Sequence, residues 1–286
     1  MTFHLSVVMP AHDEASIIGE RLRELLDSDP EQRLELVVVA NGCHDDTAAI
    51  AAAVSPRVRV VEIPQASKIA ALNAGDRAAI TFPRAYVDAD VRVTAAALLA
   101  VAARLDGRPG QVGAPTLVVD ASSASAPVRR YYRIWEHSEY RLTGHIGSGV
   151  YVLSAAARAR FGEFPEIIAD DRFVQQLFPP VQRVTVAEQT FTVPAPRTFR
   201  ALVKRGIRIA SGNLQIADAY PDLAAGSAGS RFGPLVKRIA VRPSLWFAFA
   251  TYCYGYAVPR IAARVLKARG RIPTWNRDET NRVAAA

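Results

Sequence analysis

The residues Tyr86-Val87-Asp88-Ala89-Asp90-Val91 decide the fold, because an apolar strand end runs here directly into two aspartates one residue apart. On an extended backbone, side chains at positions i and i+2 point the same way, so Asp88 and Asp90 are expected to present two carboxylates on one side. A hard divalent ion such as Mg²⁺ or Mn²⁺ takes carboxylate oxygens and completes its coordination with water and phosphates. An isolated pair of this kind is more often a solvated turn, so the neighbouring elements must decide.

Strand patterns and helix patterns alternate through the first ninety residues. Apolar runs typical of buried parallel strands lie at 5–9 (ended by Pro10), 34–39, 58–63 and 84–87. Between them, helical patterns occupy 17–26, the Ala-rich stretch opened by 45–47, and 67–80. This alternation predicts an α/β fold with an open, mostly parallel central sheet and helices on both faces. Ligands of such sheets bind at the carboxyl ends of the strands, where the polar clusters 12–14, 41–46 and 88–90 fall.

Composition and charge bound the possible partners. The chain has 286 residues, half of them hydrophobic, which is ample for a large core. The formal net charge is +8, but residues 197–286 carry +12 and residues 1–196 carry −4. This asymmetry predicts an anionic partner, either a phosphate group or an anionic membrane face. Nucleic acid is not expected, because no nucleic-acid-binding motif is found.

The cysteines and the N-terminal residues predict the compartment. Cys43 and Cys253 lie far apart without a C-x-x-C or Cys/His cluster, so neither a disulfide framework nor a zinc site is indicated. The first residues show no basic region followed by a long apolar run, so no signal peptide is expected. A reducing, cytoplasmic environment is therefore predicted, with the inner face of the membrane as a candidate location.

Six short motifs then bring the sequence close to a known family. They are P-A-H-D-E (10–14), N-G-C-H-D-D-T (41–47), K-I-A-A-L-N-A-G (68–75), D-A-D (88–90), G-S-G (147–149) and A-D-D (169–171). In this order and spacing they resemble the GT-A fold (Rossmann-like) glycosyltransferases of family 2, over about residues 3–215. The resemblance implies transfer of a sugar from a nucleotide diphosphate donor by a metal-dependent, inverting single displacement.

The resemblance also implies a donor site. Asp90, with Asp88, would hold Mn²⁺ or Mg²⁺. Contacts to the nucleotide sugar are expected from Pro10, Ala11, Glu14, Asn41, Asp45, Lys68, Asp88, Arg205 and Arg208. Ala40 and Asn41 stand where the family usually carries two aspartates, so the choice between a UDP-linked and a GDP-linked donor stays open. The ordinary structural alternatives are a helix start for Glu14 and a solvated surface position for Lys68.

On the acceptor side, the resemblance assigns the general base to Asp171. Its neighbour Asp170 stands where glutamate is more usual, and one of the two carboxylates is also expected to cap a helix. The turn Gly147-Ser148-Gly149 is expected to line the acceptor side. Trp135 is a candidate sugar platform, although its helical stripe fits a core equally well. The acceptor itself is unknown.

A cationic stripe follows the predicted catalytic part of the chain. Arg197, Arg200, Lys204 and Arg208 recur at helical spacing. Arg208, together with Arg205, could neutralise charge on the departing diphosphate, whereas a solvated helix face is the simpler interpretation. The family often carries Q-x-x-R-W here, and only the arginine matches.

The last segment is apolar and aromatic. Residues 243–259 are flanked by arginines and fall short of a comfortable membrane span. Such a segment predicts an interfacial helix or hairpin on an anionic membrane, with a buried covering helix or an oligomer contact as alternatives. The Ala/Gly/Ser-rich stretch from Pro221 to Ser230 is predicted to be a linker.

The predicted organisation is therefore a GT-A catalytic domain at 1–195, divided into a nucleotide-sugar half (about 1–92) and an acceptor half (about 93–195). A basic helix at the cleft (196–220) and a linker with a C-terminal aromatic and basic helical extension (221–286) follow. Two other functions stay open. A sugar-1-phosphate nucleotidyltransferase would need a glycine-rich loop that residues 10–13 do not supply. A catalytically weak membrane-surface binding protein on a GT-A scaffold would tolerate the lost family residues.

Overall fold

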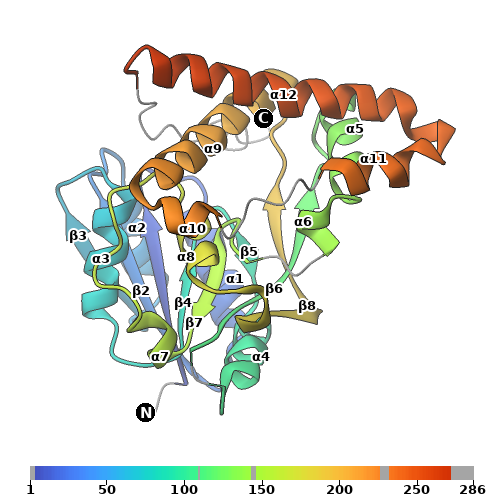
Figure 1. Ribbon diagram of the computed structural model, residues 1–286. Coiled ribbons are helices and arrows are strands. Elements are labelled where there is room, and N and C mark those ends of the chain that lie inside the picture. The colour runs from blue at the N-terminus through green and yellow to red at the C-terminus, as the bar shows by residue number, and fades with distance from the viewer. Residues whose placement is uncertain (1–3, 109, 143–145, 226–231, 272–286) are drawn as a thin grey trace. The chain divides into compact units, whose positions relative to one another are not determined.

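The computed structural model describes residues 4–108, 110–142, 146–225 and 232–271 (Figure 1). The chain divides into two compact units. The first contains residues 1–118, 146–166 and 178–193, and the second contains 119–145, 167–177 and 194–286. The end of the predicted linker and the last fifteen residues of the predicted extension, 272–286, lie outside the described residues.

Within the described residues, eight strands form one sheet in the order β3-β2-β1-β4-β7-β6-β8-β5. Their bounds are β1 Leu5–Ala11, β2 Leu34–Asn41, β3 Val58–Ile63, β4 Arg84–Val87, β5 Arg92–Val93, β6 Val112–Asp120, β7 Val150–Leu153 and β8 Arg183–Pro194. The pairs β1–β2, β1–β4 and β2–β3 are parallel, and β7 runs antiparallel to β4 and β6. The predicted α/β fold class is confirmed; the short strand β5 and the long strand β8 were not predicted.

The strand order places a topological switch point between β1 and β4. The chain moves outward from β1 to β2 through α1 (Ile18–Asp27) and from β2 to β3 through α2 (Thr47–Val54), then returns through α3 (Lys68–Ala78) to the other side of β1. Because parallel crossovers are right-handed, this reversal puts α3 on the opposite face of the sheet from α1 and α2. A ligand crevice is expected outside the carboxyl ends of β1 and β4.

The central strands are buried along their whole length, as their unbroken apolar runs predict. One boundary differs from the prediction: β1 continues through Pro10, which pairs with Val39 of β2. Proline lacks an N–H group, yet it is tolerated here because β4 pairs with β1 only from Ser6 to Val8. The strand therefore carries its last residue, Ala11, up to the edge where the polar loops begin.

The other helices complete the two units. The first unit adds α4 (Ala95–Leu105), α7 (Ala155–Arg158) and the 3₁₀ turn η1 (Pro180–Gln182). The second unit has α5 (Ala126–Trp135), α6 (Glu139–Leu142), α8 (Asp170–Leu177), α9 (Phe199–Ala219), α10 (Pro221–Ala225), α11 (Phe232–Ala240), η2 (Pro243–Leu245) and α12 (Trp246–Ala268). Helix α10 occupies the start of the predicted linker, and residues 226–231 are outside the described residues.

Helix α12 explains the aromatic C-terminal segment. It buries Ala248, Tyr252, Gly255, Pro259 and Ala263, which recur every three or four residues on one face. This face packs on α5 and α9, and α12 crosses α9 in Figure 1. No helix in the described part of the chain combines the length and apolar character needed to cross a bilayer.

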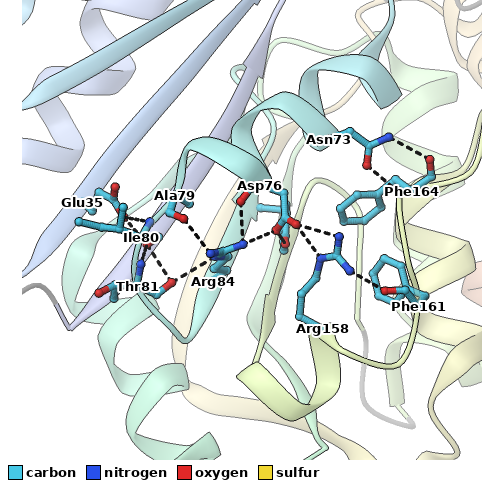
Figure 2. A network of polar contacts seen from close by, with 12 residues as sticks. Glu35, Asn73, Asp76, Ala79, Ile80, Thr81, Arg84, Arg158, Phe161 and Phe164 are labelled. Carbon is cyan, nitrogen blue, oxygen red and sulfur yellow. Dashed lines mark hydrogen bonds and ion pairs between the residues drawn. The ribbon is translucent and has the colours of Figure 1, made fainter.

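A polar network that sequence patterns did not predict anchors the opposite end of the sheet from the switch point. Figure 2 shows Asp76 of α3 between Arg84 and Arg158, at 2.7 and 2.8 Å, and the hydroxyl of Tyr86 donates to the same carboxylate at 2.5 Å. Burial alone would raise the pKa of Asp76, but the hydrogen bonds from Tyr86 and the two arginines outweigh it and lower that pKa. The network joins α3, β4 and the last residue of α7.

Candidate functional site

The two aspartates that follow β4 lie in a tight turn. The N–H of Val91 donates to the carbonyl of Asp88 at 3.0 Å, so the chain bends immediately after the strand instead of continuing extended. Asp88 and Asp90 are both partly exposed, whereas Ala89 between them is buried. The extended backbone that was expected to place both carboxylates on one side is therefore replaced by a turn.

Lys68 reaches this acidic turn from the first residue of α3. Its ammonium lies 2.7 Å from Oδ1 of Asp88, and its side chain is only 16% exposed. The helix begins here because the Ser67 side chain accepts a hydrogen bond from the N–H of Ala70. The structure thus brings together the lysine and the aspartate that the family resemblance assigned to the nucleotide-sugar donor.

The predicted Gly147-Ser148-Gly149 turn meets the same carboxylate. All three residues have positive φ, of 108°, 58° and 94°. The carbonyl of Gly149 accepts from the N–H of Asp88 at 2.8 Å, and a Cβ at Gly149 would lie 2.8 Å from Val91 and 3.2 Å from an Asp88 carboxylate oxygen. Glycine is therefore required for the approach to Asp88, both by conformation and by space.

The loops after β1 and β2 are joined by Asn41. The Asn41 side chain is buried and donates to the carbonyl of Ala11 at 2.8 Å, which connects the ends of the two strands. Pro10 and Ala11 are the last two residues of β1, so their main chain lies at this edge. The predicted donor contacts Pro10, Ala11 and Asn41 are therefore neighbours, although the Asn41 amide is engaged with the protein's own backbone.

Asp45 organises the loop that follows Asn41. Its carboxylate accepts from the N–H of Ala15 at 3.1 Å and from the N–H and hydroxyl of Thr47. The Thr47 hydroxyl in turn accepts from the N–H of Glu14 at 2.6 Å, and the Glu14 side chain is buried. These contacts hold the loops after β1 and β2 together, so Asp45 has a structural role within this chain. Its predicted contact to the nucleotide stays a prediction.

The cysteine spacing indicated no zinc site, but the fold brings together three side chains that could hold a metal ion. Ligand atoms of His12, Asp13 and Cys43 lie within 4.8 Å of one another, and all three residues are half-buried. The cluster has no sequence motif, because about thirty residues separate His12 and Asp13 from Cys43. The parallel pairing of Ala11 with Ala40 brings them together, and that register was the signal that could have revealed the cluster.

The remaining predicted residues lie in the second unit. Asp170 and Asp171 open α8, as predicted; Asp170 is buried and Asp171 is half-buried. The turn before them is held against α9, because the N–H of Ile168 donates to the Gln215 side chain at 3.0 Å. A Cβ at Gly212 of α9 would come within 2.9 Å of Ala169, so glycine permits this close packing.

Three of the four residues of the predicted cationic stripe lie on helix α9, and Arg197 does not. Helix α9 begins at Phe199, so Arg197 precedes it and uses its carbonyl to accept from the N–H of Ser125. Arg200 and Lys204 are exposed on α9, and Arg205 and Arg208 are half-buried. That Arg205 and Arg208 contact the donor diphosphate stays a prediction.

Trp135 ends α5 and belongs to an aromatic cluster. Its ring lies 5.8 Å from Tyr132 and 6.0 Å from Tyr140, and the Arg141 guanidinium lies 5.3 Å from its centre. The predicted helical spacing through this region is interrupted, because α5 ends here and α6 begins at Glu139. These contacts give Trp135 a packing role; a stacking role toward a sugar stays a prediction.

Three solved structures from different proteins are similar to this chain in fold. A mannosyltransferase from Pyrobaculum calidifontis, in complex with GDP-Man and Mn²⁺, has a TM-score of 0.58 and 20% identity, covering 94% of this chain and 80% of its own. S. aureus TarS (residues 1–349) has a TM-score of 0.52 and 16% identity, with 93% and 92% covered. Glucosyl-3-phosphoglycerate synthase from Mycobacterium tuberculosis, in complex with phosphoglyceric acid, has a TM-score of 0.54 and 18% identity, with 75% and 78% covered. At these identities the likeness establishes the fold, which is the GT-A class.

The sequence supplies the family within that class. The family described as Glycosyl transferase family 2 matches residues 6–161, more than half of the chain. The chain belongs to this family and is a glycosyltransferase. No curated protein matches the chain.

Proposed function

We propose that this glycosyltransferase moves a sugar from a nucleotide diphosphate donor to an acceptor hydroxyl, with a divalent metal and with inversion at the anomeric carbon. The observation that carries the proposal is the acidic turn after β4. There, Asp88 is paired with Lys68 and backed by Gly149, and Asp90 is partly exposed, at the edge where the strand order reverses.

The residues of this turn fit a hard divalent ion. Asp90 and Asp88 offer carboxylate oxygens, the ligands that Mn²⁺ and Mg²⁺ prefer, and their partial exposure leaves access for water and phosphate oxygens. When bound, the ion supplies Lewis-acid stabilisation of the diphosphate leaving group. The nearby Lys68 ammonium adds positive charge for the same phosphates, and a bound ion would compete with it for Asp88.

Asp171 is proposed as the general base. It removes the proton from the acceptor hydroxyl as that oxygen attacks the anomeric carbon, and the bond from this carbon to the diphosphate oxygen breaks on the opposite side. Arg205 and Arg208 are proposed to offset the charge of the released nucleotide diphosphate. These three roles rest on the family resemblance, and their support is membership in family 2.

The donor base stays open between uridine and guanosine. The structure with a TM-score of 0.58 was solved with GDP-Man, and TarS was also solved with UDP-GlcNAc at a TM-score of 0.52. Both kinds of donor are therefore found on this fold. Family membership favours sugar transfer over the nucleotidyltransferase alternative, and the intact acidic turn argues against a purely binding role.

Two variants test the donor and base assignments. Asp90→Ala should abolish Mn²⁺-dependent transfer or hydrolysis of a nucleotide sugar, measured as release of nucleoside diphosphate. Asp171→Asn should lower turnover by about 10²- to 10⁴-fold, the usual contribution of a general base, while nucleotide binding measured by calorimetry is kept. Asp222→Asn, at an exposed acid early in α10, is the matched control and should change neither quantity. Unchanged activity in Asp90→Ala would reject the metal assignment.

We also propose that α12 binds an anionic membrane surface. Its face opposite the packed one exposes aromatic and aliphatic side chains: Trp246, Phe247, Tyr254, Ile261 and Val265. Arg264, Lys267, Arg269 and Arg271 follow along the same helix and just beyond it, and all are exposed. An exposed apolar stripe beside clustered cations is the pattern of an interfacial helix on anionic lipid. This would place the enzyme peripherally on the inner face of the membrane.

Flotation of the full chain with vesicles tests this surface. Binding should require anionic lipid, and the triple variant Trp246→Ser, Phe247→Ser, Ile261→Ser should reduce partitioning by about tenfold or more, since each buried side chain of this kind contributes about 1.5–3 kcal/mol. Ile80→Ser with Val181→Ser removes apolar side chains of the first unit that are even more exposed, and should have no effect. Equal loss in both variants, or equal binding to neutral vesicles, would contradict the proposal.

A further inference from the structure

The loops after β1 and β2 hold an imidazole, a carboxylate and a thiol in one place. The nearest ligand atoms of His12, Asp13 and Cys43 all lie within 4.8 Å of one another. In a tetrahedral zinc site, bonds of about 2.0–2.3 Å separate the ligand atoms by about 3.3–3.8 Å. The cluster is therefore slightly wider than a loaded site, and a small movement of two adjacent loops would close it.

The hydrogen bond made by His12 decides which of its nitrogens can bind an ion. Its Nδ1 lies 2.6 Å from the carbonyl oxygen of Asn41, and a carbonyl can only accept, so Nδ1 carries the proton. The lone pair of the neutral ring is then on Nε2, which lies 3.6 Å from Oδ2 of Asp13. Metal-binding histidines are commonly oriented in this way, with the second ring nitrogen donating to a backbone carbonyl.

The same geometry leaves two acceptor atoms facing each other. His12 Nε2 and Asp13 Oδ2 can both donate a lone pair to a cation, and they lie 3.6 Å apart. Asp13 is fixed in place because its other oxygen accepts from the N–H of His44 at 2.6 Å.

Cys43 adds a sulfur ligand, which favours Zn²⁺ over Mn²⁺ and Mg²⁺. Its Sγ lies 3.5 Å from the carbonyl of Ala11, on the same edge of the sheet. Burial raises the pKa of the Cys43 thiol, and metal binding requires this group to lose its proton. Thiolate and imidazole ligands favour Zn²⁺, whereas carboxylates alone favour Mn²⁺ or Mg²⁺.

We propose that His12 Nε2, Asp13 Oδ2 and Cys43 Sγ form a zinc-binding site, separate from the acidic turn after β4. Binding releases the thiol proton to solvent and joins the loops after β1 and β2. The exposed His44, whose Nδ1 lies 3.8 Å from the same Asp13 oxygen, is available as a fourth ligand. The proposal does not depend on the proposed function, because its three ligands are not among the residues proposed to bind the donor, the metal or the acceptor. Zinc would fix the loops that carry Asn41 and Asp45.

Cobalt(II) is the probe, since it occupies zinc sites and reports thiolate ligation by a near-ultraviolet charge-transfer band. The reduced, metal-free full chain should bind one Co²⁺ with this band, and Zn²⁺ should displace it. Cys43→Ser should lose the band. His12→Gln should weaken Zn²⁺ affinity by at least about 10- to 100-fold, because loss of a residue that merely supports a metal ligand already has an effect of this size. A chromogenic chelator in competition measures that affinity.

Matched variants test whether the cobalt band comes from this cluster. Cys253→Ser removes the other cysteine and His137→Gln removes a histidine of the second unit, and both should keep the band and the affinity. Asp90→Asn should also keep the band while losing Mn²⁺-dependent transfer, so failure of the proposed function is distinguishable from failure of this site. Absence of the band in the unmodified chain, or its survival in Cys43→Ser, would overturn the proposal. Thermal unfolding of each variant checks that it is folded.

Discussion

Gly149 is the residue on which the geometry of the acidic turn most directly depends. Its φ of 94° and its distance to Asp88 impose two separate requirements, one on conformation and one on space. Family resemblance pointed to the acceptor side for this glycine, whereas its contacts in the structure are with Asp88 and Val91. A substitution here should therefore affect the metal and donor phosphates as well as stability.

We predict that Gly149→Ala destabilises the fold by about 1–2 kcal/mol through the left-handed backbone alone, and also weakens Mn²⁺-dependent nucleotide binding. Gly107→Ala is the control, because Gly107 has a φ of 67° but no atom within 4 Å of the position of a new Cβ. It should show a similar loss of stability with unchanged nucleotide affinity. Denaturant unfolding and calorimetry distinguish the two effects, and equal nucleotide affinities in the two variants would contradict the role of Gly149 at Asp88.

Asp76 carries a prediction for pH. The pKa of its carboxyl is lowered in the folded chain from an ordinary value of 3.8, since hydrogen bonds from Tyr86 and the arginines overcome the effect of burial. Its contribution to stability is therefore fully present above pH 3.8 and is lost as the pH falls below that value through the lower folded pKa. Asp76→Asn should cost about 3 kcal/mol near neutral pH, because it leaves two mostly buried arginines without their carboxylate.

The control for Asp76 is an exposed ion pair. Glu163→Gln removes the partner of Arg77 at a side chain that is 73% exposed, and its effect should be below about 1 kcal/mol. Chemical denaturation of both variants and the unmodified chain from pH 2 to pH 7 measures the difference. If Asp76→Asn and the unmodified chain lost stability in parallel on acidification, the carboxylate would not be the titrating group.

At the scale of elements, the contact between α9 and α12 depends on a glycine in the middle of a helix. A Cβ at Gly206 would lie 2.7 Å from the Pro259 ring, which has little freedom to move. Glycine is otherwise unfavourable at a helix interior by about 1 kcal/mol relative to alanine. The two helices therefore give up helix propensity for close packing, and this packing orients α12 with its aromatic stripe exposed.

We predict that Gly206→Ala destabilises the chain in spite of the gain in helix propensity. Gly233→Ala in α11 meets no atom within 4 Å, so it should be neutral or stabilising by up to about 1 kcal/mol. Melting temperatures of the two variants should therefore shift in opposite directions. Stabilisation by Gly206→Ala would show that α9 and α12 do not pack as closely as described.

Elements with strong local signals were predictable from sequence. The buried strands 58–63 and 84–87 coincide with β3 and β4, and Thr94 caps α4 by accepting from the N–H of Ala97. The strand β8 was missed because its residues alternate irregularly between buried and exposed positions. Helices α6, α7 and α10 are too short, at four or five residues, to show a period.

At the scale of the whole molecule, the candidate site was predictable in part. Asp88, Asp90 and Lys68 were recognised by motif order, which is local information. The contact of Gly149 with Asp88, the Asp76 network and the His12–Cys43 cluster depend on strand register and on pairs of residues 29 to 82 positions apart, which no spacing rule contains. The sequence could thus identify the kind of enzyme, while the fold was needed to identify the partners of each residue.

The number of residues in helix α3 is constrained by ion pairs at its start and near its end. Lys68 at its start is paired with Asp88, and Asp76 near its end is paired with Arg84, so the helix is attached at both ends of β4. Eight residues at 1.5 Å each make a rigid spacer of about 12 Å. A single inserted residue would rotate one attachment by about 100° relative to the other. The helix therefore fixes both the distance and the rotation between its two ion pairs. Insertions or deletions between Lys68 and Asp76 are expected to be far less tolerated than substitutions on the outer face of the helix.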